Sequence, residues 1–203
     1  LTTRPEDILQ DPEITLVAEC MGGEEPAGAL MREALQSGKT VVTANKMALA
    51  LHWQPLRDAS RMSGAGLYYE ASVCGAIPII RSIRESLQAN RISAVMGIVN
   101  GTTNYILDKM TTEQTDYEAA LVQAQDLGYA EADPTADVEG YDAAAKAAIL
   151  ASIAFHSRVT AADVYREGIS SISSADLESA AKLDCTIKLL SICERIVEAD
   201  GTE

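Results

Sequence analysis

The first third of this 203-residue chain alternates short apolar runs with helical segments, and this alternation constrains the fold more than any other feature. The runs ITLVAECM, TVVTA and LYYEA, at residues 14–21, 40–44 and 67–71, are typical of buried strands. Between them, residues 25–36 and 46–62 carry apolar side chains at helical spacing. Strand, helix, strand, helix and strand in this order predict a parallel sheet with right-handed crossovers.

Residues that could meet a ligand follow the predicted strands, because parallel sheets bind ligands beyond the carboxyl ends of their strands. Met21 and Gly22 follow the first strand, and Thr43 and Asn45 follow the second. The glycine could serve only as a turn, and Asn45 could serve only as the cap of the next helix. Lys46 lies in the first turn of that helix, where its charge opposes the helix dipole, so we expect it to meet a ligand phosphate or an acid.

The chain contains no GxGxxG sequence, which is the fingerprint of a dinucleotide pyrophosphate site. We therefore expect an α/β fold in which residues 1–72 form the C-terminal half of a Rossmann-type parallel sheet and residues 73–203 form a mixed α/β domain. The second domain is expected to contain helices at residues 79–87, 104–110, 115–127 and 142–155 and a strand at residues 91–100. Residues 186–197 are expected to form a long strand, with a helix as the alternative. Residues 115–118 read TDYE and predict a capping box, and residues 173–176 cap a further short helix.

The segment GYAEADPTADVEGYDAAAK, residues 128–146, concentrates carboxylates in one loop and ends on a single lysine. Its acids are Glu131, Asp133, Asp137, Glu139 and Asp142. If Asp142 opens a helix, it shares a helix face with Lys146, one turn away. That arrangement suits an ammonium-bearing substrate beside a proton-transferring lysine. The alternative is a solvated loop with a helix salt bridge, whereas Pro134 and Val138 break the ligand pattern of a calcium-binding EF-hand loop.

The composition limits the classes of molecule that the chain can bind. A formal net charge of −14 argues against nucleic acid or an anionic membrane. The four cysteines form no CxxC pair and there are only two histidines, so the cysteines are expected to be buried thiols in a reducing compartment rather than zinc ligands. No apolar run is long enough to span a membrane, and the opening LTTRPEDILQ has no leader character. We therefore expect a cytoplasmic location.

Four segments make the sequence recognisable: VVTANKMALA, YEASVCGAIPII, GIVNGTTNYIL and GYAEADPTADVEGYDAAAK. In this order and at these separations they closely resemble the homoserine dehydrogenase family, and the likeness extends from about residue 14 to about residue 197. The resemblance implies interconversion of L-homoserine and L-aspartate 4-semialdehyde with NAD or NADP, in threonine, methionine and isoleucine biosynthesis. It also implies a Rossmann-type nucleotide domain paired with a mixed α/β domain for substrate binding and dimerisation.

The resemblance assigns the substrate site to the acidic segment and to the GIVNGTTNYIL segment. Glu131 and Asp142 would hold the amino group of the substrate, and Asp137 would support the acidic pocket. The residues implied to line the same site are Tyr129, Gly101 and Thr102. Lys146 is similar to the lysine that donates and accepts the proton of the reacting oxygen. The sequence leaves open whether Lys146 or Lys46 carries that proton, and Lys146 is preferred.

The resemblance also implies cofactor and cation sites. Lys46 matches a second catalytic lysine at the nicotinamide end, which would contact the cofactor. From their place beyond the strand ends, Met21, Gly22, Thr43 and Asn45 are expected to bind the cofactor as well. A sodium or potassium ion would be held by the Glu70 carboxylate and the backbone carbonyls of Val73, Gly75 and Ile77.

Two interpretations remain from the sequence. The preferred one is the catalytic portion of a homoserine dehydrogenase, and the other is a non-catalytic amino-acid-binding dimerisation module that has lost its cofactor half. An aspartate-semialdehyde dehydrogenase would need a cysteine nucleophile such as Cys74, and no histidine pattern supports it. We expect a homodimer, because long exposed strand edges need a partner. Without the glycine-rich half, we expect this polypeptide by itself to bind dinucleotide poorly and to turn over little substrate, and NAD versus NADP stays open.

Overall fold

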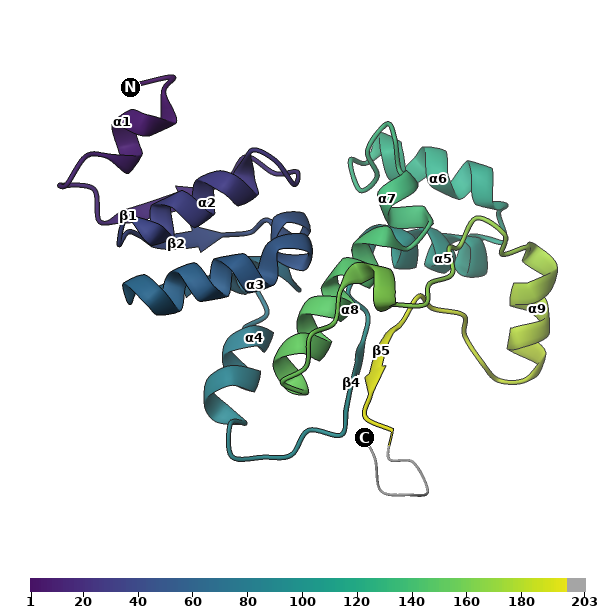
Figure 1. Ribbon diagram of the computed structural model, residues 1–203. Coiled ribbons are helices and arrows are strands. Elements are labelled where there is room, and N and C mark those ends of the chain that lie inside the picture. The colour runs from purple at the N-terminus through teal and green to yellow at the C-terminus, as the bar shows by residue number, and fades with distance from the viewer. Residues whose placement is uncertain (197–203) are drawn as a thin grey trace. The chain divides into compact units, whose positions relative to one another are not determined.

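The computed structural model describes residues 1–196, which pack as two compact units (Figure 1). Unit 1 comprises Leu1–Ile92 and Ala148–Thr160, and unit 2 comprises Ser93–Ala147 and the residues from Ala161 on. Residues 73–92 therefore pack with the first unit, while the domain boundary after residue 72 stays a prediction. No helix within residues 1–196 combines the length and the apolar character needed to cross a membrane.

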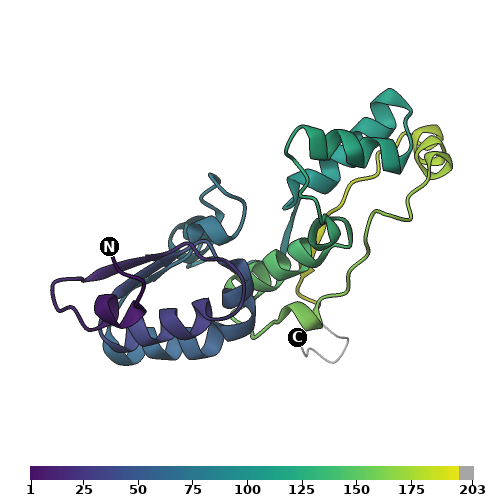
Figure 2. The ribbon, with the colours of Figure 1, turned by 90° about the horizontal axis from the view of Figure 1, so that it is seen from above.

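Unit 1 contains the parallel sheet that the alternating pattern predicted. Strands β1 (Leu16–Glu19), β2 (Thr40–Thr43) and β3 (Leu67–Tyr68) are hydrogen-bonded in the order β1-β2-β3, all parallel. Helices α2 (Ala27–Gln36) and α3 (Lys46–Ser63) lie side by side along one face of the sheet (Figure 1, Figure 2). The α/β class and the Rossmann-type parallel sheet are thus confirmed.

The helices of unit 1 are held by apolar burial and by their caps. The largest fully buried side chains of this layer are Met31, Leu35, Val41, Leu49 and Leu56. Each contributes about 1.5–3 kcal/mol by leaving water. The Asn45 side chain caps α3 by accepting the Ala48 amide at 3.0 Å, and Gly64 ends the helix in the left-handed conformation with φ of 76°. Between these ends α3 kinks at His52, three residues before Pro55, which lacks the amide needed for the helical bond.

The third strand is shorter than the sequence suggests. β3 ends at Tyr68, and Glu70–Ser72 form a 3-10 turn instead of the expected continuation to residue 71. The physical reason is a competing cap: the Glu70 carboxylate accepts the amides of Ile80 and Arg81, at 2.9 and 2.8 Å, where helix α4 (Ile79–Arg81) begins. The helix expected at residues 79–87 is present, and its second part, Ser82–Ser86, is a π-turn.

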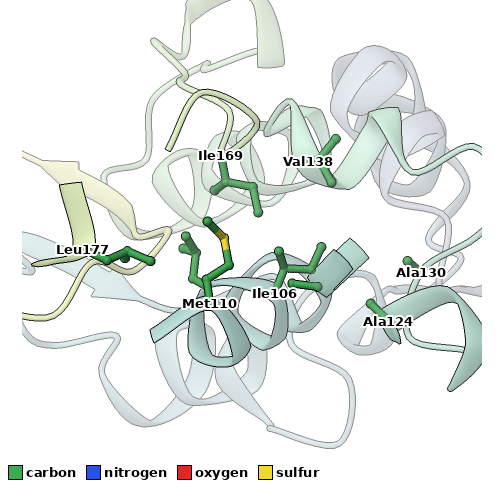
Figure 3. Close-up of a cluster of buried hydrophobic side chains, with 9 residues drawn as sticks. Ile106, Met110, Ala124, Ala130, Val138, Ile169 and Leu177 are labelled. Carbon is green, nitrogen blue, oxygen red and sulfur yellow. The ribbon is translucent and has the colours of Figure 1, made fainter. Parts of the chain in front are cut away.

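Unit 2 is mostly helical around one apolar cluster (Figure 3). Its helices are α5 (Gly101–Glu113), α6 (Tyr117–Asp126), α7 (Thr135–Val138), the first half of α8 (Tyr141–Ala154), and α9 (Ser174–Lys182), with a 3-10 turn at Ala161–Asp163. Strands β4 (Ala94–Gly97) and β5 (Ser191–Glu194) pair antiparallel. The cluster is formed by Ile106, Leu107, Met110, Ala120, Ala124, Ala130, Val138, Ile169 and Leu177.

Several boundaries in unit 2 differ from the predicted ones. The strands expected at residues 91–100 and 186–197 shrink to four residues each, and residue 197 lies outside the described residues. Helix α5 begins three residues earlier than expected because Asn100 caps it. The capping box predicted at residues 115–118 is wrong: the cap of α6 is Asp116, whose carboxylate accepts the Ala119 amide at 2.8 Å. The capping box between Ser173 and Asp176 is present.

Two short helices and the state of the cysteines were not foreseen. Helix α1 (Pro5–Leu9) and helix α7 are too short for periodicity to reveal. All four cysteines are free. The expectation that they are buried is wrong for Cys20 and Cys185, which are exposed, whereas Cys193 is buried and Cys74 is half-buried.

Candidate functional site

The first turn of α8 carries a buried ion pair. The Lys146 ammonium lies 2.7 Å from the Asp142 carboxylate, and the two side chains are 16% and 6% exposed. The same ammonium donates a hydrogen bond to the backbone carbonyl of Val99 at 2.7 Å. The i,i+4 spacing predicted from the sequence is therefore realised, and the alternative of a solvated loop is wrong for Asp142. Two acceptors on different elements hold the lysine head group in one place.

Asn100, which was not singled out as a site residue, organises this cluster. Its amide nitrogen donates to Asp137 at 2.7 Å and to Asp142 at 2.9 Å. Its amide oxygen accepts the Thr103 backbone amide at 2.9 Å and so caps α5. The residue is 4% exposed. An asparagine directly before a helix is a cap signal, but nothing local indicates that its other end binds two carboxylates 37 and 42 residues away.

The charge of the cluster is unbalanced. Asp137 and Asp142 bring two formal negative charges and Lys146 brings one positive charge. One net negative charge in a mostly buried setting favours binding of a further cation, because low local dielectric strengthens the attraction. The ammonium group of an amino acid is a cation of suitable size and hydrogen-bonding capacity.

The residues expected to line the substrate site lie beside this cluster in unit 2. The Thr102 hydroxyl donates to the carbonyl of Tyr129 at 2.7 Å, which ties the start of α5 to the acidic segment. The Tyr129 ring is 58% exposed and stacks on Tyr105 with centroids 4.7 Å apart. Gly101 opens α5, and a Cβ atom added there would have no neighbour within 4 Å. Nothing in the packing of the chain requires that glycine, which leaves open space next to Asn100.

Glu131 is not part of this network. It is exposed, and the Gln125 side chain donates to its backbone carbonyl at 3.1 Å rather than to its carboxylate. Of the other acids in the segment, Asp133 accepts the Thr135 amide, and hydrogen bonds from Thr135 hold its pKa below the usual range. Glu139 accepts from the Ser170 hydroxyl at 2.7 Å. The structure therefore gathers Asp137, Asp142 and Lys146, while a role of Glu131 in holding an amine stays a prediction.

Four of the five expected cofactor positions in unit 1 share one hydrogen-bond network. The amides of Met21 and Gly22 and the hydroxyl of Thr43 all donate to the carboxylate of Glu19, which was not predicted as a site residue. Asn45 donates to the same carboxylate at 3.4 Å. These groups lie at the carboxyl ends of β1 and β2, where a parallel sheet binds its ligand. Lys46 is the half-buried first residue of α3 and follows Asn45 directly.

The oxygens of the expected cation site occur in a strained loop of unit 1. Cys74 and Ala76, on either side of Gly75, have left-handed φ angles of 51° and 67°. Both Glu70 oxygens accept backbone amides, and each keeps a lone pair. One carboxylate with backbone carbonyls suits a hard cation better than zinc. Within residues 1–196, no group of three or more histidine, cysteine, aspartate or glutamate side chains is placed to hold a metal ion.

Fold and site together define an α/β protein with a Rossmann-type parallel unit and a second unit that holds a lysine against buried carboxylates. Two family models match the chain: "Homoserine dehydrogenase, NAD binding domain" over residues 1–70 and "Homoserine dehydrogenase" over residues 78–201. The chain belongs to the homoserine dehydrogenase family.

Curated and solved relatives agree with this membership. The homoserine dehydrogenase of Mycobacterium tuberculosis H37Rv is 56% identical over 203 residues, which are 100% of this chain and 46% of that protein. That of Bacillus subtilis is 48% identical over 96% of this chain and 45% of its own length. The crystal structure of a homoserine dehydrogenase from Thiobacillus denitrificans matches with a TM-score of 0.93 and 46% identity, over 96% of this chain and 45% of that chain. The chain thus spans about half the length of the relatives it matches.

Proposed function

We propose that the complete protein containing this chain is a homoserine dehydrogenase, which interconverts L-aspartate 4-semialdehyde and L-homoserine with NAD or NADP. The observation that carries this proposal is the buried Lys146 ammonium, held between Asp142 and the Val99 carbonyl in a chain of this family. A homologous hyperthermophilic archaeal homoserine dehydrogenase, 26% identical with a TM-score of 0.82, was solved in complex with NADPH. When bound, the nicotinamide cofactor supplies the hydride.

The acidic cluster binds the amino group of the substrate. Asn100 fixes the side chains of Asp137 and Asp142 by donating to both. The substrate ammonium compensates their excess negative charge, with Glu131 reaching it from the exposed segment. Gly101 allows the substrate close to the start of α5, since no side chain fills that space.

Lys146 transfers the proton. Reduction of the aldehyde turns its carbonyl oxygen into an alkoxide, which the Lys146 ammonium protonates, and in the reverse direction the neutral amine takes that proton back. General acid catalysis of this kind accelerates a reaction by roughly 10²–10⁴-fold. The contacts to Asp142 and Val99 orient the ammonium before the reaction starts, so little reorganisation is needed during it. Lys46 contacts the cofactor at its nicotinamide end.

Three further assignments accompany the activity. A sodium or potassium ion binds at Glu70 and the carbonyls of Val73, Gly75 and Ile77. Two copies associate through the β4–β5 sheet, where the paired Met96 and Ile192 are 59% and 55% exposed on one face. The protein works in the cytoplasm, where free thiols persist.

The test uses the complete protein, L-homoserine and either NAD or NADP, with formation of reduced nicotinamide followed by absorbance. We expect turnover, and we expect Lys146→Met to lose at least about 10²-fold in kcat. Lys109→Met is the matched control, because Lys109 also pairs with an acid at i,i+4, on the surface of α5. If homoserine binds by calorimetry and no nucleotide is reduced, the chain is an amino-acid-binding module instead.

A further inference from the structure

Strand β1 ends on a buried carboxylate. Glu19 is the last residue of the strand, lies in register with Thr43 of β2, and is only 5% exposed. Taking a carboxylate out of water costs several kcal/mol unless hydrogen bonds replace the lost hydration. Packing alone does not explain a glutamate at this buried position, because burying an apolar side chain there would avoid the desolvation cost of a carboxylate.

Four neutral groups donate to this carboxylate: two come from the loop after β1, one from the last residue of β2, and one from the residue that caps α3. One oxygen accepts the amides of Met21 and Gly22, at 2.8 and 3.3 Å, and the Asn45 side chain at 3.4 Å. The other oxygen accepts the Thr43 hydroxyl. Glu19 thus joins the loop after β1 to the loop after β2.

The network continues into α3. Asn45 donates to the Gly23 carbonyl at 2.7 Å and accepts the Ala48 amide at 3.0 Å, so the same side chain links the first loop to the helix start. The Thr43 hydroxyl also accepts the Asn45 amide at 2.9 Å. Through these bonds Glu19 sets the position of the backbone from which Lys46 extends.

The orientation of the amides limits what this end of the sheet can bind. The amides of Met21 and Gly22 face inward to Glu19, so they do not serve as phosphate donors. The buried negative charge further disfavours an anion above the loop. A sugar hydroxyl and the uncharged or cationic nicotinamide ring are compatible with that charge. Gly22 leaves room for them, since an added Cβ there would have no neighbour within 4 Å.

We propose that Glu19 is a positioning residue for the dinucleotide. Its carboxylate holds residues 20–23 and residues 43–46 together through hydrogen bonds, and so shapes the crevice that binds the nicotinamide-riboside half of the cofactor. This inference rests on the proposed function, because that function supplies the cofactor. Pre-ordering two loops lowers the conformational cost that the ligand would otherwise carry on binding. Glu19 acts through these loops and has no part in the proton transfer.

Binding of NADP and NADPH to the complete protein, measured by calorimetry, tests the proposal. We expect Glu19→Gln to weaken the binding of NADP and of NADPH about ten-fold. The amide nitrogen of glutamine is itself a donor and cannot accept a hydrogen bond from Thr43 or Asn45, so the two loops are no longer held together. Thr43→Val removes one donor and leaves the charge, and we expect a smaller loss. At saturating cofactor the kcat of Glu19→Gln should stay near the wild-type value, so that this substitution changes the KM for the cofactor and not the kcat.

Lys39→Met is the matched structural control. Lys39 is also buried, 5% exposed, and donates to the carbonyls of Asp11 and Ile14, at the opposite end of the same sheet. We expect it to lower the melting temperature without a specific loss of cofactor affinity. If Glu19→Gln and Thr43→Val bind cofactor as tightly as the wild type, the positioning role is overturned. It is also overturned if their loss of cofactor affinity is no larger than the loss in Lys39→Met. Cofactor binding by the wild type without homoserine turnover overturns the proposed function alone, and absence of cofactor binding overturns both.

Discussion

Replacing Lys146 by methionine tests how much the ion pair between Lys146 and Asp142, at the start of α8, contributes to the free energy of unfolding. Methionine keeps most of the apolar stem and removes the charge, so the Asp142 carboxylate loses its closest partner. At 2.7 Å, the direct attraction is about 6 kcal/mol with an effective dielectric of about 20, and removing one partner of a buried pair typically costs about 3–5 kcal/mol.

The structure places this variant at the low end of that range. Lys146 retains 16% exposure, and Asn100 still donates to Asp142 at 2.9 Å after the lysine is gone. We therefore expect the free energy of unfolding to fall by about 3 kcal/mol. Because the pair is largely shielded from solvent, this loss should change little between low and high salt.

Urea unfolding of the complete protein, followed by circular dichroism, measures this loss. Lys109→Met serves again as the control, since its pair with Glu113 has the same spacing and is more exposed, and we expect little change in stability. The double variant Lys146→Met with Asp142→Leu removes both charges and should recover most of the lost stability. Equal losses in Lys146→Met and Lys109→Met, or a double variant less stable than the single one, would refute the reasoning.

The remaining predictions concern other parts of the chain. Gly101→Ala should raise the KM for homoserine several-fold without lowering the unfolding free energy, because helices favour alanine; an unchanged KM would mean that no ligand approaches there. Burial raises the pKa of the Cys193 thiol, so iodoacetamide should modify the exposed Cys20 and Cys185 first; equal rates by mass spectrometry would contradict this. Hydrogen bonds from the Ser173 side chain and backbone lower the pKa of Asp176. The stabilisation of α9 should therefore be complete above about pH 4, the unfolded value, and be lost as pH falls through the lower folded pKa. Amide exchange in α9 should show this loss in the wild type and not in Asp176→Asn.

The sequence predicted elements well where the signal is local. The parallel unit follows from alternating apolar runs and helical periods, and the pairing of Asp142 with Lys146 follows from helical spacing. The strand expected at residues 91–100 was too long, because a strand ends where its partner ends and β5 offers only four residues for pairing. The strand expected at residues 67–71 was cut short by a cap to a helix ten residues further on.

Glu131, Asn100 and Glu19 show the limit of local inference at the site. The resemblance implied that Glu131 holds the substrate amine together with Asp142; the fold leaves Glu131 exposed outside the hydrogen-bond network, and its role stays a prediction. Asn100 and Glu19 drew no prediction as site residues because each has two hydrogen-bond partners far along the chain. Asn100 reaches residues 37 and 42 positions away, and Glu19 reaches residues 24 and 26 positions away.

The amino-acid order alone determined the α/β class, the order of the first three strands and of the two helices between them, and the helix face that carries Asp142 and Lys146. These features depend on backbone periodicity and on contacts within one turn. Tertiary structure alone decided which carboxylates are buried and which polar side chains hold them, since burial and hydrogen bonding between distant residues exist only once the chain has packed. For this reason the positions of Asn100 and Glu19 at the centres of the two hydrogen-bond networks became visible only in the fold.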